Sequence, residues 1–295
     1  MGKKSKGKKR ARKTVLLGKL LALLPASCIL LYPLYLAAQL DSVEEDYVNP
    51  ALPGAFEGLR LAFVSDIHYG ALLGEDRVRA LVRRVNAWQP DVILLGGDYG
   101  EDSDGALAFW RLRPGFQAKI CVAATVGNHD RTLPESNLEK IKEAMRANDV
   151  IPLVNDAIVL DRQGQTLALT STDDFYNGCP DLPRIAALCA RADFTVFFPH
   201  NPDILAEMDD LPGGPFYQLA LCGHTHGGPV ALFGHALHSS SQYGDRYLSG
   251  WYRENGTDIL VSNGVGTSML PVRLGARPQI HLLTLRSRKA PLLRE

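Results

Sequence analysis

Five short stretches of this sequence carry Asp, Asn or His directly after an apolar run. In chain order they are Asp66-Ile67-His68, Gly96-Gly97-Asp98, Gly127-Asn128-His129-Asp130, His200 and Gly223-His224-Thr225-His226. Carboxylate, amide and imidazole groups are the ligands that first-row divalent cations accept in proteins. The apolar runs predict buried strands, and an α/β sheet presents side chains to a ligand at its strand ends. The sequence therefore predicts a metal site first.

The motifs differ in how specifically each one indicates a metal site. His224 and His226, two residues apart and bracketed by glycines, have few structural explanations. Asp66-x-His68 and Gly97-Asp98 are also ordinary turn sequences, and a lone histidine such as His200 is more often a loop residue. The order of the five motifs, each after a predicted strand, is what favours a shared site.

Other chemistries receive less support. The sequence has no Gly-x-Ser-x-Gly elbow, P-loop or His-Glu-x-x-His motif. His235 and His238 fall in a loop-rich segment and His281 in a predicted strand, so all three are predicted to be structural. No Cys-x-x-Cys pair is present, and Cys179 and Cys189 remain candidates for a disulfide only if the domain faces an oxidising compartment.

Charge is distributed unevenly along the chain. Residues 1–13 hold eight basic residues and no acid, whereas residues 41–295 hold 32 acidic and 23 basic residues, a formal charge of −9. An acidic body argues against broad nucleic-acid binding. We therefore expect no nucleic-acid partner, and we interpret residues 1–13 as a basic cytoplasmic tail.

The apolar segment at residues 14–40 predicts a transmembrane signal-anchor. Lys19 is its only charge, and it exceeds the roughly 20 residues that a helix needs to cross a bilayer. The acidic residues that follow place the N-terminus in the cytoplasm and the remaining domain outside the cell membrane. A cleaved signal peptide is the alternative, although Leu36-Ala37-Ala38 is a poor cleavage site.

The elements that must position the motifs alternate between strand and helix patterns. Residues 41–58 are predicted to be a linker because Pro50, Pro53 and Gly54 interrupt them. Strands are predicted over 59–65, 91–95, 120–126, 151–154, 157–160, 167–170, 194–199, 217–222, 258–262 and 279–285, and helices over 76–88, 103–112, 134–147, 182–190 and 202–208. Residues 228–252 are predicted to be a loop-rich insert. This pattern favours two mixed β-sheets packed face to face with helices outside, as one domain over 59–287 followed by a short tail over 288–295.

The conjunction of motifs resembles the calcineurin-like metallophosphoesterase family over about residues 59–285. Within that family the chain is similar to the membrane-anchored bacterial branch that includes UDP-diacylglucosamine hydrolases. That similarity rests on the anchor, Gly-His-Thr-His-Gly-Gly, and Asn263-Gly264-Val265-Gly266-Thr267 with Pro271-Val272-Arg273. Pro229 departs from the glutamine that such sequences often carry, which concerns a substrate contact rather than a metal ligand.

The resemblance implies a four-layer αββα sandwich and two divalent metal ions, with manganese favoured over iron or zinc. It assigns Asp66, His68 and His226 to one ion, Asn128, His200 and His224 to the other, and Asp98 as the bridge. His129 is implied as the catalytic acid, with Asp130 or another carboxylate orienting its ring. Arg131 is a candidate substrate contact, with a structural role on the surface as the alternative.

The implied function is hydrolysis of a phosphodiester or pyrophosphate bond by a metal-bridging hydroxide, with a membrane partner and a substrate that is lipid-linked. The anchor and short linker motivate the lipid, because they hold the site near headgroups. A phosphomonoesterase or nucleotide hydrolase, and a non-catalytic scaffold of the same fold, are the alternatives. All expected ligand positions are filled, which favours an enzyme.

Overall fold

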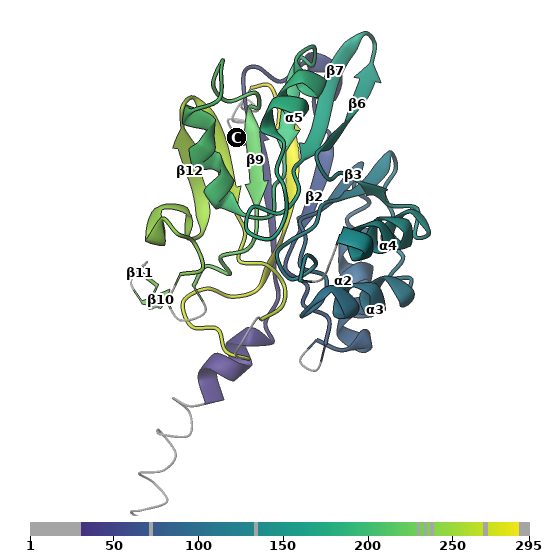
Figure 1. Ribbon diagram of the computed structural model, residues 1–295, viewed down its shortest axis with the longest axis vertical. Coiled ribbons are helices and arrows are strands. Elements are labelled where there is room, and N and C mark those ends of the chain that lie inside the picture. Colours follow the sequence, from purple (N-terminus) through teal and green to yellow (C-terminus); the bar gives the residue numbers. More distant parts are fainter. Residues whose placement is uncertain are drawn as a thin grey trace, which may run out of the picture.

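The computed structural model describes residues 31–70, 73–132, 135–228, 231–232, 235–236, 239–267 and 271–288. The basic tail, most of the predicted signal-anchor and nearly all of the C-terminal tail lie outside these residues. Residues 31–37 are helical and project from one end of the molecule (Figure 1). None of the helices in the described ranges has both the length and the apolar character to span a bilayer.

The first sheet has six strands in the order β1-β14-β2-β3-β4-β5. Its strands are β1 (Asp41–Val48), β2 (Arg60–Val64), β3 (Val92–Leu95), β4 (Cys121–Ala124), β5 (Ile151–Pro152) and β14 (Gln279–Arg286). β2 to β5 are parallel, β14 is antiparallel to β2, and β1 is parallel to β14. The carboxyl ends of β2, β3 and β4 therefore point to the same edge of the sheet.

The second sheet also has six strands, in the order β12-β13-β9-β8-β7-β6. Its strands are β6 (Asp156–Arg162), β7 (Gln165–Ser171), β8 (Phe194–Phe197), β9 (Leu219–Cys222), β12 (Gly250–Glu254) and β13 (Thr257–Val261). β7, β8, β9 and β13 are parallel, and antiparallel β6 and β12 form the edges. A small two-stranded sheet of β10 (Ala231–Leu232) and β11 (His235–Ala236) lies apart.

Helices cover the outer faces of both sheets. They are α2 (Glu75–Ala87), α3 (Ser103–Arg111), α4 (Glu135–Arg146) and α5 (Leu182–Cys189), with the 3₁₀ helices η2 (Pro202–Asp209) and η3 (Gly244–Tyr247). The 3₁₀ helix η1 (Gly54–Phe56) instead buries Phe56 in the core between the sheets. Asp102 and Asp181 accept backbone N–H groups at the starts of α3 and α5, as N-cap residues do. Figure 1 shows α2, α3 and α4 grouped together at the lower right and α5 apart from them, near β6 and β7.

Alternation along the strands creates the layers. On β2, Ala62 and Val64 belong to the core shared with α2 to α4, while Leu61 and Phe63 belong to the core between the sheets. On β9, Leu221 faces that same inter-sheet core and Ala220 faces the core that includes α5 and η2. Successive side chains of a strand point to opposite faces, so each strand serves two cores. The predicted fold of two mixed sheets with outer helices is confirmed.

The predicted linker at 41–58 is wrong in its first half. Residues 41–48 form β1, an edge strand that pairs with the full length of β14. Tyr47 stacks on Trp251 at 5.6 Å between ring centroids, which joins the outer edges of the two sheets. The acidic residues of β1 obscured the strand in the sequence, because charges on an edge strand are a common device against edge-to-edge pairing.

Smaller differences concern boundaries and sulfur. Residues 202–208, predicted to be helical, belong to the 3₁₀ helix η2, and the segment 228–252 contains β10, β11, η3 and the start of β12. Cys179 and Cys189 are free thiols, the first exposed and the second buried. The predicted strands that precede the motif loops end in the structure at the predicted residue or one or two residues earlier.

Candidate metal centre

The loops that follow five strands bring the predicted site residues together. Asp66 and His68 follow β2, Asp98 follows β3, and Asn128 with His129 follows β4. From the second sheet, His200 follows β8, and His224 with His226 follows β9. All of these side chains are buried except those of Asn128 and His129, which are partly exposed.

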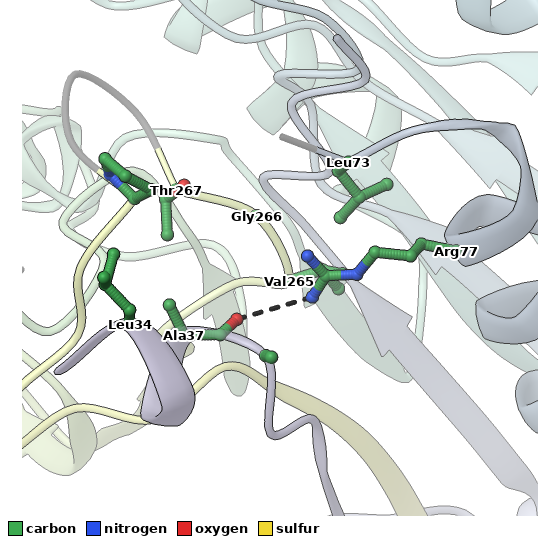
Figure 2. Close-up of a pocket in the computed structure, with 9 residues that line it drawn as sticks. Leu34, Ala37, Leu73, Arg77, Val265, Gly266 and Thr267 are labelled. Atoms are coloured by element: carbon green, nitrogen blue, oxygen red, sulfur yellow. Dashed lines mark hydrogen bonds between the residues drawn. The ribbon is translucent and has the colours of Figure 1, made fainter. Parts of the chain in front are cut away.

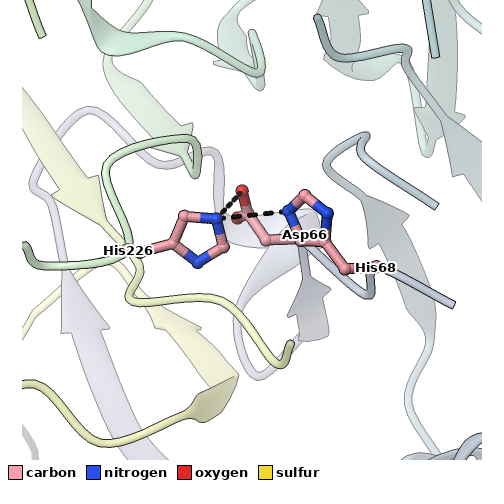
Figure 3. Close-up of side chains that lie close together, drawn as sticks. All are labelled: Asp66, His68 and His226. Atoms are coloured by element: carbon pink, nitrogen blue, oxygen red, sulfur yellow. Dashed lines mark hydrogen bonds and ion pairs between the residues drawn. The ribbon is translucent and has the colours of Figure 1, made fainter. Parts of the chain in front are cut away.

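Asp66, His68 and His226 form the first group of potential ligands (Figure 3). The Nε2 atoms of His68 and His226 are 3.2 Å apart, and His226 Nε2 lies 3.7 Å from Asp66 Oδ1. One nitrogen or oxygen atom from each residue therefore faces a common point. Two imidazoles and a carboxylate suit a first-row divalent cation better than calcium.

Asp98 lies between this group and the rest of the site. Its Oδ2 is 3.7 Å from His68 Nε2 on one side and 3.1 Å from His200 Nε2 on the other. Ligand atoms of Asp66, Asp98 and His200 also gather closely enough to hold an ion. A carboxylate in this position can contact two cations at once.

Asn128 and His224 complete the second group. Asn128 Oδ1 and His224 Nδ1 are 2.8 Å apart, and the rings of His224 and His200 pack edge to face at 5.2 Å between centroids. The seven predicted ligands therefore gather in one place, although they come from both sheets. Their assignment to individual ions remains a prediction.

The ionisation of the cluster follows from its burial. Burial lowers the pKa of His68 to about 3 and that of His224 to about 4. Burial also opposes a charge on His200, but the Asp98 carboxylate outweighs it and raises the pKa of His200 to about 10. Without a cation, Asp98 and His200 form a buried ion pair while His68 and His224 are neutral. Neutral imidazoles keep the lone pair that a metal requires.

One buried polar atom in the cluster supports a cation. Asp66 Oδ2 has no hydrogen-bond partner among the described residues. Buried polar groups are almost always satisfied, and a bound ion is one of the usual reasons for an exception. The oxygen and imidazole donors present here fit divalent cations.

The backbone of the ligand loops is unusual. Five predicted ligands have positive φ angles, namely Asp66 (55°), His68 (49°), Asp98 (56°), His224 (71°) and His226 (55°). This left-handed region is uncommon for non-glycine residues, although Asp and His are enriched among those that enter it, and it clusters at functional sites. The loops turn sharply enough to aim successive side chains at one point.

Glycines allow the loops to approach one another. A Cβ on Gly127 would lie 2.2 Å from Asp98 Oδ1, and one on Gly223 would lie 2.3 Å from Asp66 Oδ2. A Cβ on Gly264, from the loop after β13, would lie 2.5 Å from the Asp66 Cβ. The glycines in the predicted motifs therefore make room for the carboxylates.

His129 lies at the margin of the cluster. Its ring packs edge to face on His68 at 4.8 Å, and its Nδ1 donates to the Glu101 carbonyl oxygen at 2.8 Å, because a carbonyl can only accept. Burial lowers the pKa of His129, but the Asp98 charge, the hydrogen bond to the Glu101 carbonyl and the Asp130 charge together outweigh it, so the net shift is upward. The protonated form is favoured relative to an ordinary histidine.

The expectation that Asp130 orients His129 is wrong. The Asp130 carboxylate instead accepts the backbone N–H groups of Asp98, Tyr99 and Gly127 at 2.7 to 3.0 Å. It therefore joins the loop after β3 to the loop after β4. Its side chain faces this turn because three N–H donors converge there, and the Glu101 carbonyl takes the place beside His129.

Arg131 is buried. The alternative to a substrate contact was a structural role on the surface, and that surface position is wrong. Its Nε and guanidinium nitrogen contact the two Asp173 oxygens at 3.0 Å each. A two-point pair of this kind has a fixed geometry. The structure gives Arg131 a role in holding the loop after β4, and provides no support for the substrate contact.

Two groups near the site were not singled out from sequence. Arg273 donates to the carbonyl oxygen of His226 and to its Nδ1, the latter at 2.8 Å. Tyr176 packs its ring on His224 at 5.5 Å and donates to Asp203 at 2.6 Å. Arg273 had a signal in the late Pro-Val-Arg segment, whereas nothing near Tyr176 distinguished it from other loop aromatics.

Comparison with known proteins agrees with this geometry. The family model for calcineurin-like phosphoesterases matches residues 59–262, so the chain belongs to that family. It is 27% identical over 255 residues to the uncharacterized metallophosphoesterase YkuE of Bacillus subtilis, covering 84% of this chain and 86% of that protein. It is 29% identical to the phosphodiesterase YaeI of Escherichia coli (81% and 92% covered).

A bovine "transmembrane protein with metallophosphoesterase domain" is 27% identical over 252 residues, which cover 80% of this chain and 55% of that protein. The family and the names of these relatives identify the chain as a metal-dependent phosphoester hydrolase. Among the described residues, the Asp and His cluster offers groups that could hold divalent cations.

Proposed function

We propose that this chain hydrolyses a phosphodiester or pyrophosphate bond with two divalent cations. The observation that carries the proposal is the position of Asp98 between two groups of potential ligands, 3.1 Å from His200 and 3.7 Å from His68. A carboxylate shared by two cations is typical of two-metal hydrolytic sites. Bound cations of this kind lower the pKa of a water and stabilise charge on the phosphoryl oxygens.

In this proposal each side chain has a separate role. Asp66, His68 and His226 hold one cation, and Asn128, His200 and His224 hold the other. Manganese is the favoured metal and iron or zinc the alternatives, since the donor set mixes oxygen and imidazole nitrogen. The loops that would hold these cations carry glycines at positions where a Cβ would collide with the Asp66 or Asp98 side chain.

His129 is proposed to protonate the leaving oxygen. Its Nδ1 proton is engaged by the Glu101 carbonyl, which fixes the ring and leaves Nε2 for proton transfer. The raised pKa favours the form that can donate, and partial exposure allows the ring to meet a substrate. General acid catalysis of this kind contributes about 100- to 10,000-fold.

A lipid-linked substrate is supported by the surface next to the site. Leu31, Tyr32, Leu34 and Tyr35 lie on the helix at 31–37 and are 40% to 60% exposed, although they are large and apolar. Beneath that helix, a cavity of about 130 Å³ is lined by Leu34, Ala37, Leu73, Val265 and neighbouring residues (Figure 2). Exposed apolar clusters of this kind mark membrane or partner contact sites.

The same features support a membrane location. We propose that residues 14–40 anchor the chain, with the N-terminus in the cytoplasm and the domain outside, as the charge distribution favours. The name of the bovine relative agrees with an anchored protein. Protease treatment of intact cells or spheroplasts tests the orientation, and protection of the domain would reverse it.

Hydrolysis by the full chain, stripped of metal and reloaded with Mn²⁺, tests the proposed activity. We expect bis(p-nitrophenyl) phosphate to be cleaved faster than p-nitrophenyl phosphate. A faster monoester reaction would favour the phosphomonoesterase alternative, and no reaction with any phosphoester would favour the scaffold. For the lipid, two phosphodiesters with one headgroup and different chain lengths are compared below their micelle concentrations. Equal kcat/KM for both would overturn a lipid-linked substrate.

A further inference from the structure

Arg273 is one of the largest fully buried side chains, and it lies directly against the first group of ligands. Its guanidinium donates to the carbonyl oxygens of His226, Asn263 and Gly266 and to His226 Nδ1. Among the described residues these partners are carbonyl oxygens and one imidazole nitrogen, with no carboxylate. A guanidinium has no acceptor atom, so His226 Nδ1 must accept, and in the neutral ring Nε2, which faces Asp66 and His68, then carries the proton that a bound cation would displace.

Such a residue is costly to keep for stability alone. Burial of the guanidinium disfavours its charge and lowers the pKa of Arg273 to about 10, although the Asp66 carboxylate opposes the shift. Buried charges are weak evidence for stability, because apolar replacements of the same size often serve as well. The contacts of Arg273 instead suggest that it fixes the groups it touches.

The loop that Arg273 holds also contacts Asp66. Gly266 N–H donates to the Asp66 carbonyl oxygen at 2.6 Å, and Gly264 packs against the Asp66 side chain. By binding Asn263 and Gly266 on one side and His226 on the other, the guanidinium ties both parts of the first group together. The second group has no contact with Arg273 among the hydrogen bonds described here.

The backbone of Arg273 leads away from the site to the N-terminal helix. Its N–H donates to the carbonyl oxygen of Pro33 at 3.1 Å, within the helical residues 31–37. Arg77 also holds this helix, because it donates to the Ala37 carbonyl oxygen (Figure 2). Arg84 holds the residues after the helix, because it donates to the Leu40 carbonyl oxygen. Hydrogen bonds of Arg273 therefore connect the helix at 31–37 to the His226 ring.

We propose that Arg273 is a positioning residue for the cation bound by Asp66, His68 and His226, and that the seating of the helix at 31–37 helps to set its place. The inference rests on the proposed metal centre. The new claim is that only the cation bound by Asp66, His68 and His226 is coupled to the helix at 31–37, which follows the apolar N-terminal region.

The first experiment measures Mn²⁺ binding to the full-length metal-free chain by calorimetry, with stoichiometry checked by elemental analysis. In Arg273→Gln we expect one of two sites to weaken by about 10- to 100-fold, the usual loss when a partner of a ligand is removed. Arg273→Lys keeps the charge and some donors and should recover part of that loss. Arg286→Gln, at the far end of β14 beside Asp46 and Glu57, is the matched control.

The outcomes separate the two claims. If the wild-type chain binds no Mn²⁺, the proposed metal centre fails. If the wild type binds two ions and Arg273→Gln binds both equally well, Arg273 has no positioning role. Equal weakening of both sites would indicate a general structural role and would also overturn the inference. Urea unfolding of each metal-free variant sets the conditions in which the chain is folded.

A second pair of variants tests the helix without altering the site. Leu36 is 8% exposed on the seated face, whereas Tyr32 on the same helix is 53% exposed. Leu36→Asp should unseat the helix and weaken the same single cation site by about 10-fold, in the range for outer-shell partners. Tyr32→Asp carries the same change of charge and should leave both sites unchanged. If the two variants bind alike, the helix is not coupled to the centre.

Discussion

Two regions of this molecule bury imidazole rings, and they do so in opposite ways. At the carboxyl edge of the sheets, the rings of His68, His200, His224 and His226 lie among carboxylates, amide oxygens and one another. In the middle of β14, His281 is equally buried, but neither ring nitrogen has a hydrogen-bond partner among the described residues.

The pKa does not distinguish these regions. Burial lowers the pKa of His281 to about 4, much as it lowers the pKa of His224 to about 4 and that of His68 to about 3. The difference lies in the neighbours and in the backbone, since three of the four edge histidines have positive φ and His281 has regular strand geometry. A depressed histidine pKa therefore reports burial, and a site requires convergent partners as well.

The largest effect is expected at Asp98, on which the edge cluster depends. Asp98→Asn removes the charge that pairs with His200 and lies near His68. Both cation affinities should fall by more than the roughly 100-fold that losing an outer-shell partner costs. Calorimetry with Mn²⁺ measures the affinities, and urea unfolding shows whether the chain remains folded. Loss of only one cation would refute the shared position of Asp98.

His129 provides the next largest effect, because it is the half-buried imidazole of the edge region. His129→Ala should lower kcat by about 100- to 10,000-fold on a substrate with a poor leaving group. The loss should shrink with p-nitrophenolate, which needs little protonation. Cation stoichiometry should be unchanged, which separates an acid from a ligand. An equal loss with both leaving groups would contradict the assigned role.

His281 is predicted to contribute to acid sensitivity of the fold, together with the buried edge histidines, and not to activity. The unfolded chain has a histidine pKa near 6.5, and folding lowers it to about 4. The contribution of the neutral His281 ring to the free energy of unfolding is therefore complete above pH 6.5 and is lost as the pH falls from 6.5 towards 4. Over that range His281 should cost the wild type about 3 kcal/mol of unfolding free energy, and His281→Leu should not lose this amount.

Urea unfolding of the metal-free chain at pH 7 and pH 4 measures this difference. His235→Leu is the control, because His235 is an exposed histidine that contacts Asp245 at the surface. Its unfolding free energy should follow the wild type at both pH values. If His281→Leu also follows the wild type, the buried imidazole is not the source of the acid sensitivity.

The smallest effect is expected at Tyr176, which borders the edge cluster from outside. Tyr176→Phe keeps the ring on His224 but removes the hydroxyl that donates to Asp203 at 2.6 Å. We expect a loss of about 1 kcal/mol in unfolding free energy, the usual worth of one hydrogen bond, and Mn²⁺ affinities within a few-fold of wild type. A ten-fold loss of Mn²⁺ affinity would mean that the Tyr176 hydroxyl helps to hold the metal ligands in place.

The sequence predicted which strand ends meet, because the motifs lie where polar side chains interrupt apolar runs. Asp66, Asp98, His200 and His226 gather as that pattern indicates. The two sheets were also predictable from alternation and from short strands with helical segments between them. These features are local, so they can be read without knowing the fold.

Other parts could not be predicted because they depend on distant partners. β1 was hidden by its charges, and its pairing with β14 joins residues about 240 positions apart. The roles of Asp130 and Arg273 depend on which backbone groups converge on them, and sequence spacing carries no such information. The burial of Arg131 depends on Asp173, which lies in the loop after β7 of the second sheet.

The positive φ angles of the ligand loops affect how this centre should be dissected by mutagenesis. At Asp66, His68, Asp98, His224 and His226, alanine must adopt a left-handed conformation that costs about 1 kcal/mol and that glycine adopts freely. The native Asp and His side chains carry the same Cβ, so an alanine scan keeps this strain and removes only the ligand. Glycine removes the ligand and the strain together, and comparing the two at one position would measure how much strain the native loop carries.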